Sequence, residues 1–369
     1  MSIYQEIGLP RVINASGRVT VLGVSTMSDR VASAAKRGGQ SYVVIEELMN
    51  RAGEIISQHT GAEMSCPTSC ASAGIALSVA ALITKGCYTD MMRLPNSEGL
   101  ANQIVLQKGH SVNYGAPINT MIRLGGGVPI EVGQANEVCP EEIEESISDN
   151  TVALLYVKSH HCVQKGMVDI ETMRDIAHKH GLPFMMDCAA EEDFRKYVAL
   201  GADLVCYSGA KALEATTSGF VTGKRKYVQY IQPQYHGIGR AMKVGKEQIM
   251  GLLAALDQYD MRDSEAIFAK NVAKVDYLCQ EIAEISGFAT QKIRDEAGRA
   301  IVRCRIALTE DAPTHLTMKQ INHELRAGDP VVWGRTEFLN LGVLDLDPRP
   351  MVEGDKELIV QRLKEIMEG

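Results

Sequence analysis

Asp187 and Lys211 are the two residues whose types and positions best suit cofactor chemistry. Each follows a short apolar run that predicts a buried strand, Leu182–Met186 before the aspartate and Ala202–Tyr207 before the lysine. Because ligands of open parallel sheets collect at the carboxyl ends of strands, both side chains are expected at one edge. Burial among small residues would lower the pKa of the lysine, which an amine needs to form a Schiff base. The alternatives are a helix N-cap for the aspartate and an exposed loop position for the lysine.

Small residues at the start of a predicted helix form a candidate anion site. Ser72 and Gly74 flank Ala73, where a helix running to Thr84 is expected to begin. A phosphate can approach the free N–H groups and the positive end of such a helix, and Ser208 could add a hydroxyl. A lysine for an imine, an acid for a ring nitrogen and a helix N-terminus for a phosphate together predict a pyridoxal phosphate (PLP) site.

Three histidines follow two further predicted strands. His110 comes after Ile104–Gln107, and His160 and His161 come after Val152–Val157. An imidazole at either place could stack on a planar cofactor or move a proton, although a single histidine is more often structural. His110 and His160 are therefore candidate catalytic residues, and His110 is also a candidate cofactor contact.

Other cofactors fit the sequence less well. No GxGxxG follows a first strand, the run Gly219–Arg225 lacks the Walker spacing, and His323 opens no zincin motif. The nine cysteines are scattered, and the closest pair, Cys66 and Cys70, is neither CxxC nor followed by a second pair. We therefore expect no metal site, and cysteines that are reduced and buried.

The elements that must position these residues alternate between strand and helix in the middle of the chain. Strand–helix–strand units of this length imply right-handed crossovers and a mostly parallel sheet. After Ser286 and Gly287 the pattern changes to short β-like runs separated by helices. The sequence thus predicts an α/β protein with a large domain and a small α+β domain. The expected segments are 1–25, packing with the small domain, 26–260, the large PLP-binding domain, and 261–369, the linking helix and small domain.

Individual elements are predicted from apolar periodicity and from glycine stops. Helices are expected over Tyr42–His59, Ala73–Thr84, Asp169–His180, Glu192–Leu200, 245–259, 263–286, Thr317–Arg326 and Asp355–Met367. Further strands are expected over Gly219–Thr222, Phe288–Ile293, Ala300–Leu308, Pro330–Trp333 and Phe338–Leu344.

Composition limits the class of protein. The 369 residues are 45% apolar and 23% charged, which is typical of globular chains. The 38 basic and 46 acidic residues leave a net charge of −8, so a bulk electrostatic reason to bind nucleic acid or an acidic membrane is missing. The N-terminal residues do not resemble a signal peptide, and no apolar stretch is long enough to span a bilayer. We expect a cytoplasmic protein.

Several motifs resemble the selenocysteine-synthase-like branch of the fold-type-I PLP enzymes. The similarity extends over nearly the whole chain, and its most specific part is an Asp…Ser-x-x-Lys core. The stretches that carry it are Leu9–Gly17, Lys158–His160, His180–Asp187, Gly201–Lys211, Thr217–Gly223 and Gly239–Lys246.

This resemblance implies an aspartate-aminotransferase-like fold and a PLP enzyme that assembles at least as a dimer. Lys211 would be the lysine bonded to the cofactor and Asp187 the acid that holds the ring nitrogen, whereas Ser72, Gly74 and Ser208 would lie near the phosphate. Within the branch, length and wording are closest to ammonia-lyases of phosphorylated 2-amino-3-hydroxy sugar acids. The implied partner is thus a small-molecule substrate.

Substrate-binding cations are predicted at three places. The resemblance implies that Arg335 binds a carboxylate, for which the bidentate guanidinium is suited. Arg240, Lys243 and Lys246 form a basic cluster that could hold a substrate phosphate, and Arg18 is a weaker candidate. The alternatives are a surface salt bridge for Arg335 and a solvated helix face for the cluster.

The sequence also departs from part of this branch. The relatives that act on tRNA carry an additional N-terminal RNA-binding domain, whereas this chain begins almost at once with the Leu9–Asn14 motif. Its acidic balance points the same way, against a tRNA substrate. Another β-eliminating lyase or an aldolase remains the nearest rival, because many reactions share the core motif.

Overall fold

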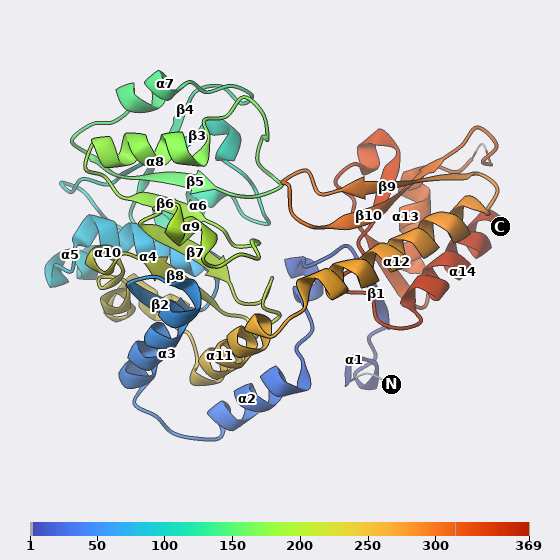
Figure 1. Ribbon diagram of the computed structural model, residues 1–369, viewed down its shortest axis with the longest axis horizontal. Coiled ribbons are helices and arrows are strands. Elements are labelled where there is room, and N and C mark those ends of the chain that lie inside the picture. The colour runs from blue at the N-terminus through green and yellow to red at the C-terminus, as the bar shows by residue number, and fades with distance from the viewer. Residues whose placement is uncertain (1–2, 314, 369) are drawn as a thin grey trace. The chain divides into compact units, whose positions relative to one another are not determined.

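The computed structural model describes residues 3–313 and 315–368, which belong to two compact units. The large unit consists of Thr26–Arg262. The small unit joins the N-terminal segment Met1–Ser25 to Asp263–Gly369, so that β1 shares a unit with the orange and red C-terminal elements of Figure 1. Each unit has its own buried apolar core.

A seven-stranded sheet forms the centre of the large unit. Its strand order is β2-β8-β7-β6-β5-β3-β4, and neighbouring strands are parallel except in the two pairs that involve β8. The predicted mostly parallel sheet is therefore confirmed. The strands are β2 (Met64–Thr68), β3 (Gln103–Gln107), β4 (Val128–Val132), β5 (Thr151–Val157), β6 (Phe184–Asp187), β7 (Leu204–Ser208) and β8 (Gly219–Gly223).

Successive side chains of the central strands enter two different cores, one on each face of the sheet. On β5, Leu154 belongs to one core and Leu155 to the other. On β7, Val205 and Cys206 divide in the same way. Because both faces are covered, these strands are continuous apolar runs, which is why the sequence reveals them.

Helices cover both faces of the sheet. The residues of α4 (Ala71–Thr84) are nearly all small or apolar, and the helix is buried along almost its whole length against β7 and β8. The more polar α3 (Ile45–Thr60) ends at Gly61, whose φ is 72°. The remaining helices of this unit are α2 (Asp29–Gly39), α5 (Tyr88–Arg93), α6 (Ile118–Leu124), α7 (Pro140–Glu145), α8 (Ile170–Lys179), α9 (Lys196–Ala199), α10 (Arg225–Val228) and α11 (Lys246–Asp260).

The small unit combines two sheets with helices. Strands β9 (Phe288–Arg294), β10 (Val302–Leu308) and β12 (Val343–Leu346) form an antiparallel sheet, and β1 (Val12–Ala15) pairs in parallel with β11 (Val331–Gly334). Its helices are α1 (Ile3–Glu6), α12 (Ser264–Ala283), α13 (Met318–Ala327) and α14 (Asp355–Glu368).

Some elements differ in extent from the prediction, and some strands of the structure were not predicted. In the predicted helix Glu192–Leu200, only Lys196–Ala199 is helical, because the Asp193 side chain accepts the N–H groups of Arg195 and Lys196 in a turn. In the predicted strand Phe338–Leu344, Leu339–Leu341 is a 3-10 turn, and only Val343 and Leu344 belong to a strand, β12. Strands β2 and β4 were missed because each contains a proline, and edge strands tolerate proline.

Over residues 3–313 and 315–368, no helix combines the length and the apolar character that crossing a bilayer requires.

A buried ion-pair network holds the small unit together. Asp347 is fully buried, and its carboxylate accepts hydrogen bonds from Arg349 and from Arg303 at 2.8–3.0 Å. Arg303 also reaches Asp295 over 3.0 Å. Burial by itself would raise the pKa of Asp347, but the charges of Arg349, Arg303 and Arg335 outweigh burial and hold the pKa well below its usual range. The Asp347 N–H donates to the Ala15 carbonyl, which ties the network to β1.

Asp347→Asn should destabilise the small unit by about 3 kcal/mol at pH 7, because it leaves buried guanidinium groups unpaired. A carboxyl whose folded pKa is lowered stabilises the fold above its unfolded pKa of about 4 and loses this effect as pH falls. The difference from wild type should therefore shrink below about pH 4. Urea unfolding at pH 7 and pH 3 measures both effects.

Asp276→Asn is the matched control, since Asp276 pairs with Lys292 on the surface and should contribute less than about 1 kcal/mol. Equal losses in the two variants would contradict the role given to Asp347.

Candidate active site

The carboxyl ends of β5, β6 and β7 lie next to one another in the large unit. In the strand register Val157 stands opposite Asp187, and Asp187 stands opposite Cys206. The Lys158 N–H donates to the Asp187 carbonyl over 2.9 Å, which ties the residue after β5 to the end of β6. Ser208 ends β7 two positions after Cys206. This edge of the sheet therefore brings Asp187, Lys158 and Ser208 together.

Asp187 is a buried carboxylate, only 5% exposed. Its Oδ1 accepts a hydrogen bond from the Ala189 N–H over 3.1 Å. Burial raises the pKa of the carboxyl, while the charge of Lys211 and the Ala189 N–H oppose the rise. The next helix, α9, has Arg195 as its N-cap, so the N-cap alternative for Asp187 does not hold. A buried carboxylate needs a cation, and a protonated pyridine nitrogen is one.

Lys211 lies in a tight turn three residues beyond Ser208. The lysine is half-buried, and its neighbours Ala210 and Ala212 are buried. The Lys211 carbonyl accepts a hydrogen bond from the Glu214 N–H over 3.2 Å, which closes the turn. The exposed-loop alternative is therefore excluded, and the ammonium lies within electrostatic range of Asp187.

The N-terminus of α4 offers donors for an anion. Cys70 is the N-cap, and its thiol accepts the Ala73 N–H over 3.3 Å. Ser72 adds a half-buried hydroxyl in the first turn. Gly74 serves packing, because its N–H already donates to the Cys70 carbonyl over 3.0 Å and a Cβ there would lie 3.1 Å from Val221 on β8. The first-turn donors and the positive end of the helix suit a phosphate.

Gly219 sets the distance between α4 and β7. It pairs with Ser208 in the antiparallel β7–β8 ladder. A Cβ on this glycine would lie 2.7 Å from the carbonyl carbon of Cys70 and 2.7 Å from the backbone oxygen of Tyr207. Because both neighbours are backbone atoms, no larger residue fits without moving the fold. The start of α4 is thereby held against the end of β7.

His110 is a fixed, neutral imidazole. It follows β3, is 1% exposed, and its Nδ1 accepts the Val157 N–H over 3.4 Å, which places the ring proton on Nε2. Burial, and then the charge of Lys158, lower the pKa of His110 to about 4. The Tyr156 ring is edge-on to the His110 ring, with their centroids 4.5 Å apart. At neutral pH the His110 ring carries no proton to give away as an imidazolium.

His160 lies in the loop after β5. Its ring is half-buried and lies 4.0 Å from the ring of His161, at an angle of 40°. The Gln164 side chain braces the loop by donating to the carbonyls of Ser159 and Cys162 at 3.0 and 2.6 Å. His160 thus stands on an ordered loop that begins directly beside the end of β6.

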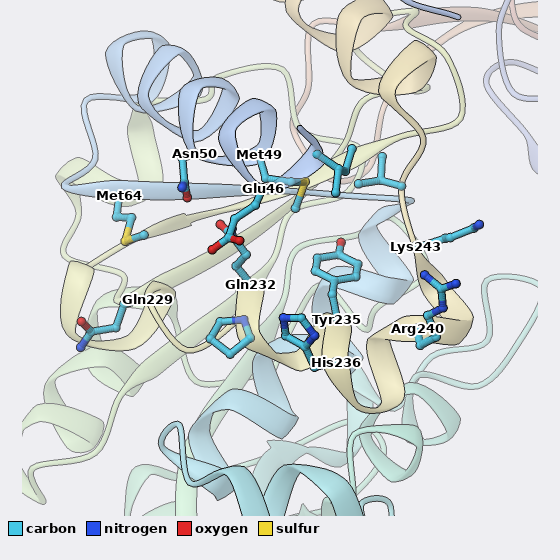
Figure 2. A pocket seen from close by; sticks show the side chains of 13 residues that line it. Glu46, Met49, Asn50, Met64, Gln229, Gln232, Tyr235, His236, Arg240 and Lys243 are labelled. Atoms are coloured by element: carbon cyan, nitrogen blue, oxygen red, sulfur yellow. The ribbon is translucent and has the colours of Figure 1, made fainter. Parts of the chain in front are cut away.

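A separate pocket of about 800 Å³ lies between α3, the start of β2 and the segment 229–244. Arg240 and Lys243, both exposed, line it with Glu46 and His236. Figure 2 shows the two cations on the same side of the pocket. Within the described part of the chain, its lining includes none of the residues at the carboxyl edge of the sheet.

Lys246, the third member of the basic cluster, has a structural partner. Its ammonium donates to the carbonyls of Gly38 and Gly39 over 2.9 and 2.6 Å. Cations commonly satisfy the last carbonyls of a helix in this way, here those of α2. The fold therefore accounts for Lys246, whereas Arg240 and Lys243 face an open pocket.

Arg335 and Arg18 belong to the small unit. Arg335 is 7% exposed and donates to the Ser16 carbonyl over 3.2 Å and to the Glu337 carboxylate over 2.5 Å. The alternative of a salt bridge holds in part, because Arg335 pairs with the exposed Glu337 although its own guanidinium is buried. Arg18 follows Gly17 and is half-buried.

Tyr114 is a site residue that sequence reasoning missed. It lies in the loop 111–117 after β3, and its hydroxyl is buried without a hydrogen-bond partner. Burial raises the pKa of Tyr114, and Ser72 and Asp187 are near enough to affect it. No feature of a Ser-Val-Asn-Tyr-Gly-Ala-Pro loop marks a tyrosine that folds back over the sheet. The signal exists only in the folded chain.

These residues fit PLP. A buried carboxylate lies in electrostatic range of a half-buried lysine, and a flat, neutral histidine adjoins the same strand ends. The first turn of α4 and the unpartnered Tyr114 hydroxyl offer donors for an anion.

Comparison with known proteins agrees with this assignment. The family model described as "SelA: L-seryl-tRNA selenium transferase" matches residues 12–312. A D-glucosaminate-6-phosphate ammonia lyase of Salmonella typhimurium is 45% identical over 367 residues, covering 100% of this chain and 98% of the relative. A 5'-C-glycyluridine monooxygenase-decarboxylase of a Streptomyces species is 38% identical, covering 99% of this chain and 92% of the relative.

Solved structures show the same relationship. The structure of a D-glucosaminate-6-phosphate ammonia-lyase superposes with a TM-score of 0.91 at 45% identity, covering 100% of this chain and 98% of that one. An aspartate aminotransferase from Thermotoga maritima shares the fold, with a TM-score of 0.57 at 14% identity and coverage of 99% and 94%. The predicted fold-type-I architecture is confirmed, and the chain belongs to the SelA family, whose members depend on pyridoxal phosphate.

Proposed function

We propose that this chain is a PLP-dependent ammonia-lyase acting on D-glucosaminate 6-phosphate, a phosphorylated 2-amino-3-hydroxy sugar acid. The observation that carries the proposal is 45% identity over the full chain to a protein of that name. The products would be 2-keto-3-deoxygluconate 6-phosphate and ammonia, because loss of the C3 hydroxyl as water leaves an enamine that tautomerises and hydrolyses.

PLP, when bound, supplies an electron sink for the electrons of the bond broken at Cα. Asp187 would hold the proton on the pyridine nitrogen, and Lys211 would anchor the cofactor. The side chains of Ser72 and Ser208 would bind the phosphate at the start of α4, while the Ala73 N–H is capped by the Cys70 thiol. His110 is proposed to contact the cofactor, because the Val157 N–H holds its imidazole at these strand ends.

Lys211 is the proposed base that removes the proton from Cα of the substrate. Hydroxide is a poor leaving group, so an acid must give a proton to the C3 oxygen. The lowered pKa of His110 argues against that role, because its imidazolium is not populated at neutral pH. Lys211 can return its own proton, and His160 on the neighbouring loop is the second candidate.

Two groups of cations are proposed for the charged ends of the substrate. Arg240 and Lys243 would bind its phosphate, supported by their exposure in one pocket. Lys246 would hold the end of α2 beside them rather than touch the substrate. Arg335 and Arg18 stay predictions for binding the substrate carboxylate. Arg335 directly follows β11, and its hydrogen bond to Glu337 fixes the position of its guanidinium.

A homo-oligomer in the cytoplasm is the proposed state of the protein. Tyr42, Val43, Val44 and Ile45 form a run of exposed apolar side chains, 48–102% accessible, next to the Arg240 pocket. Such a run is typical of a subunit interface. All nine cysteines are free thiols, which suits a reducing compartment.

The substrate assignment predicts release of ammonia and a 2-keto acid in equal amounts from D-glucosaminate 6-phosphate. The panel should include the unphosphorylated acid, other 3-hydroxy amino acids and seryl-tRNA. We expect turnover of the phosphorylated acid without oxygen uptake. Oxygen consumption with release of carbon dioxide would instead support chemistry like that of the 38% identical relative. Activity on seryl-tRNA alone would contradict the proposal.

Lys211→Ala should abolish both the yellow colour of the PLP-loaded protein and its turnover, because the amine that anchors the cofactor is gone. Borohydride should bleach wild type and leave its cofactor covalently attached. Lys179→Ala is the matched control, since Lys179 pairs with Glu144 on the surface and should keep colour and activity. A colourless but fully active Lys211→Ala protein would rule out the assigned role.

Arg240→Ala should raise KM for the phosphorylated substrate about 10-fold, through loss of a charge-assisted hydrogen bond to the phosphate. The much lower activity on the unphosphorylated acid should not change. Lys226→Ala, which removes an exposed cation from α10, is the control. A KM of Arg240→Ala equal to that of wild type would remove Arg240 from the site.

Mixing Lys211→Ala with Arg240→Ala subunits then tests whether two copies share a site. Activity above that of either variant would show that one copy contributes Arg240 to the site of another.

A further inference from the structure

We infer that Tyr114 is a cofactor-binding residue whose phenol donates a hydrogen bond to the phosphate of PLP. The inference rests on the PLP site that the proposed function uses, and it adds a residue from the loop between β3 and α6.

The Tyr114 hydroxyl is a buried donor that makes no hydrogen bond of normal geometry. Its oxygen is shielded from solvent, and the Ser72 hydroxyl lies beside it. Leaving a buried polar group unsatisfied is costly, so native structures do this rarely and for a reason. An acceptor that enters the site with a ligand satisfies the group and explains its burial.

The position of the hydroxyl identifies that acceptor as the phosphate. Ser72, its neighbour, belongs to the first turn of α4, where the helix presents N–H groups and its positive end. Two cysteines are also near enough to raise the pKa of the Tyr114 phenol. They are Cys70, the N-cap of the same helix, and Cys206, which stands opposite Asp187 in the sheet. Tyr114 therefore faces the anion-binding end of the site.

The charge state of the phenol suits an anion. Burial raises the pKa of Tyr114, and the nearby carboxylate of Asp187 acts in the same direction. The hydroxyl consequently keeps its proton at neutral pH and is a donor toward a negatively charged oxygen. It is not a base, so the assignment is to binding and not to proton removal from the substrate.

The loop around Tyr114 is braced so that the ring points inward. Asn113 and Pro117 form a β-bridge, and the Tyr114 N–H donates to the Ala116 carbonyl over 3.3 Å. The Ser111 hydroxyl is tied to Glu131 on β4 over 2.5 Å, and Asn119 of α6 donates to the same carboxylate. The ring packs against the core on the α4 side of the sheet.

The test is Tyr114→Phe, which keeps the ring and removes only the hydroxyl. Cofactor-free protein is titrated with PLP and, separately, with pyridoxal, which lacks the phosphate, and binding is followed by visible absorbance. We expect the Kd for PLP to rise about 10- to 100-fold, the effect of losing a hydrogen bond to a charged group. The Kd for pyridoxal should change less than about twofold, because the ring contacts are intact.

Tyr207→Phe is the matched control, since its hydroxyl is also buried but donates to the Asp193 carbonyl in the other core. Ser111→Ala loosens the loop without changing the phenol. It should raise the Kd for PLP by a smaller factor and leave the Kd for pyridoxal nearly unchanged. This variant takes the place of Tyr114→Phe if Tyr114→Phe does not fold. An equal loss for PLP and pyridoxal, or no loss for either, overturns the inference. Failure of wild type to bind PLP at all would instead overturn the proposed function.

Discussion

The buried carboxylate of Asp187 is the constraint on which the site depends. The sheet takes it out of water, which raises its pKa, so the negative form persists only beside a positive charge. In the protein alone the ammonium of Lys211 acts in that direction, and a protonated ring nitrogen does so when the cofactor is bound. Asp187, at the end of β6, therefore requires that the large unit bind a positively charged hydrogen-bond donor at this position.

The remaining parts of the site are held by packing rather than by charge. Strand β8 runs against its neighbours and carries Gly219, whose bare backbone lets the start of α4 touch the end of β7. Gly74 lets the same helix lie directly on β8. The anion-binding turn and the strand ends are thus parts of one rigid arrangement, and Tyr114 reaches it from a loop braced by Glu131.

Much of this arrangement is visible in the sequence because buried parallel strands are short apolar runs and the polar residues after them stand out. Asp187, Ser208 and Lys211 were found in this way. The sequence did not reveal β2 and β4, whose prolines conceal edge strands, or Tyr114, whose importance arises from a loop folding back. It also grouped Lys246 with Arg240 and Lys243, since charge along the chain does not show that Lys246 faces the end of α2.

The pairing of β1 with β11 makes the small unit dependent on the whole length of the chain. Val12 pairs with Val331, and the Ser16 carbonyl accepts Arg335, so the first strand made has no partner until the entire large unit has been synthesised. At about 5–20 residues per second, that interval is on the order of tens of seconds. The large unit can fold as one continuous segment while residues 12–16 wait. A fusion or tag near residue 12 therefore acts on the fold of the C-terminal unit, although it is attached at the opposite end of the chain.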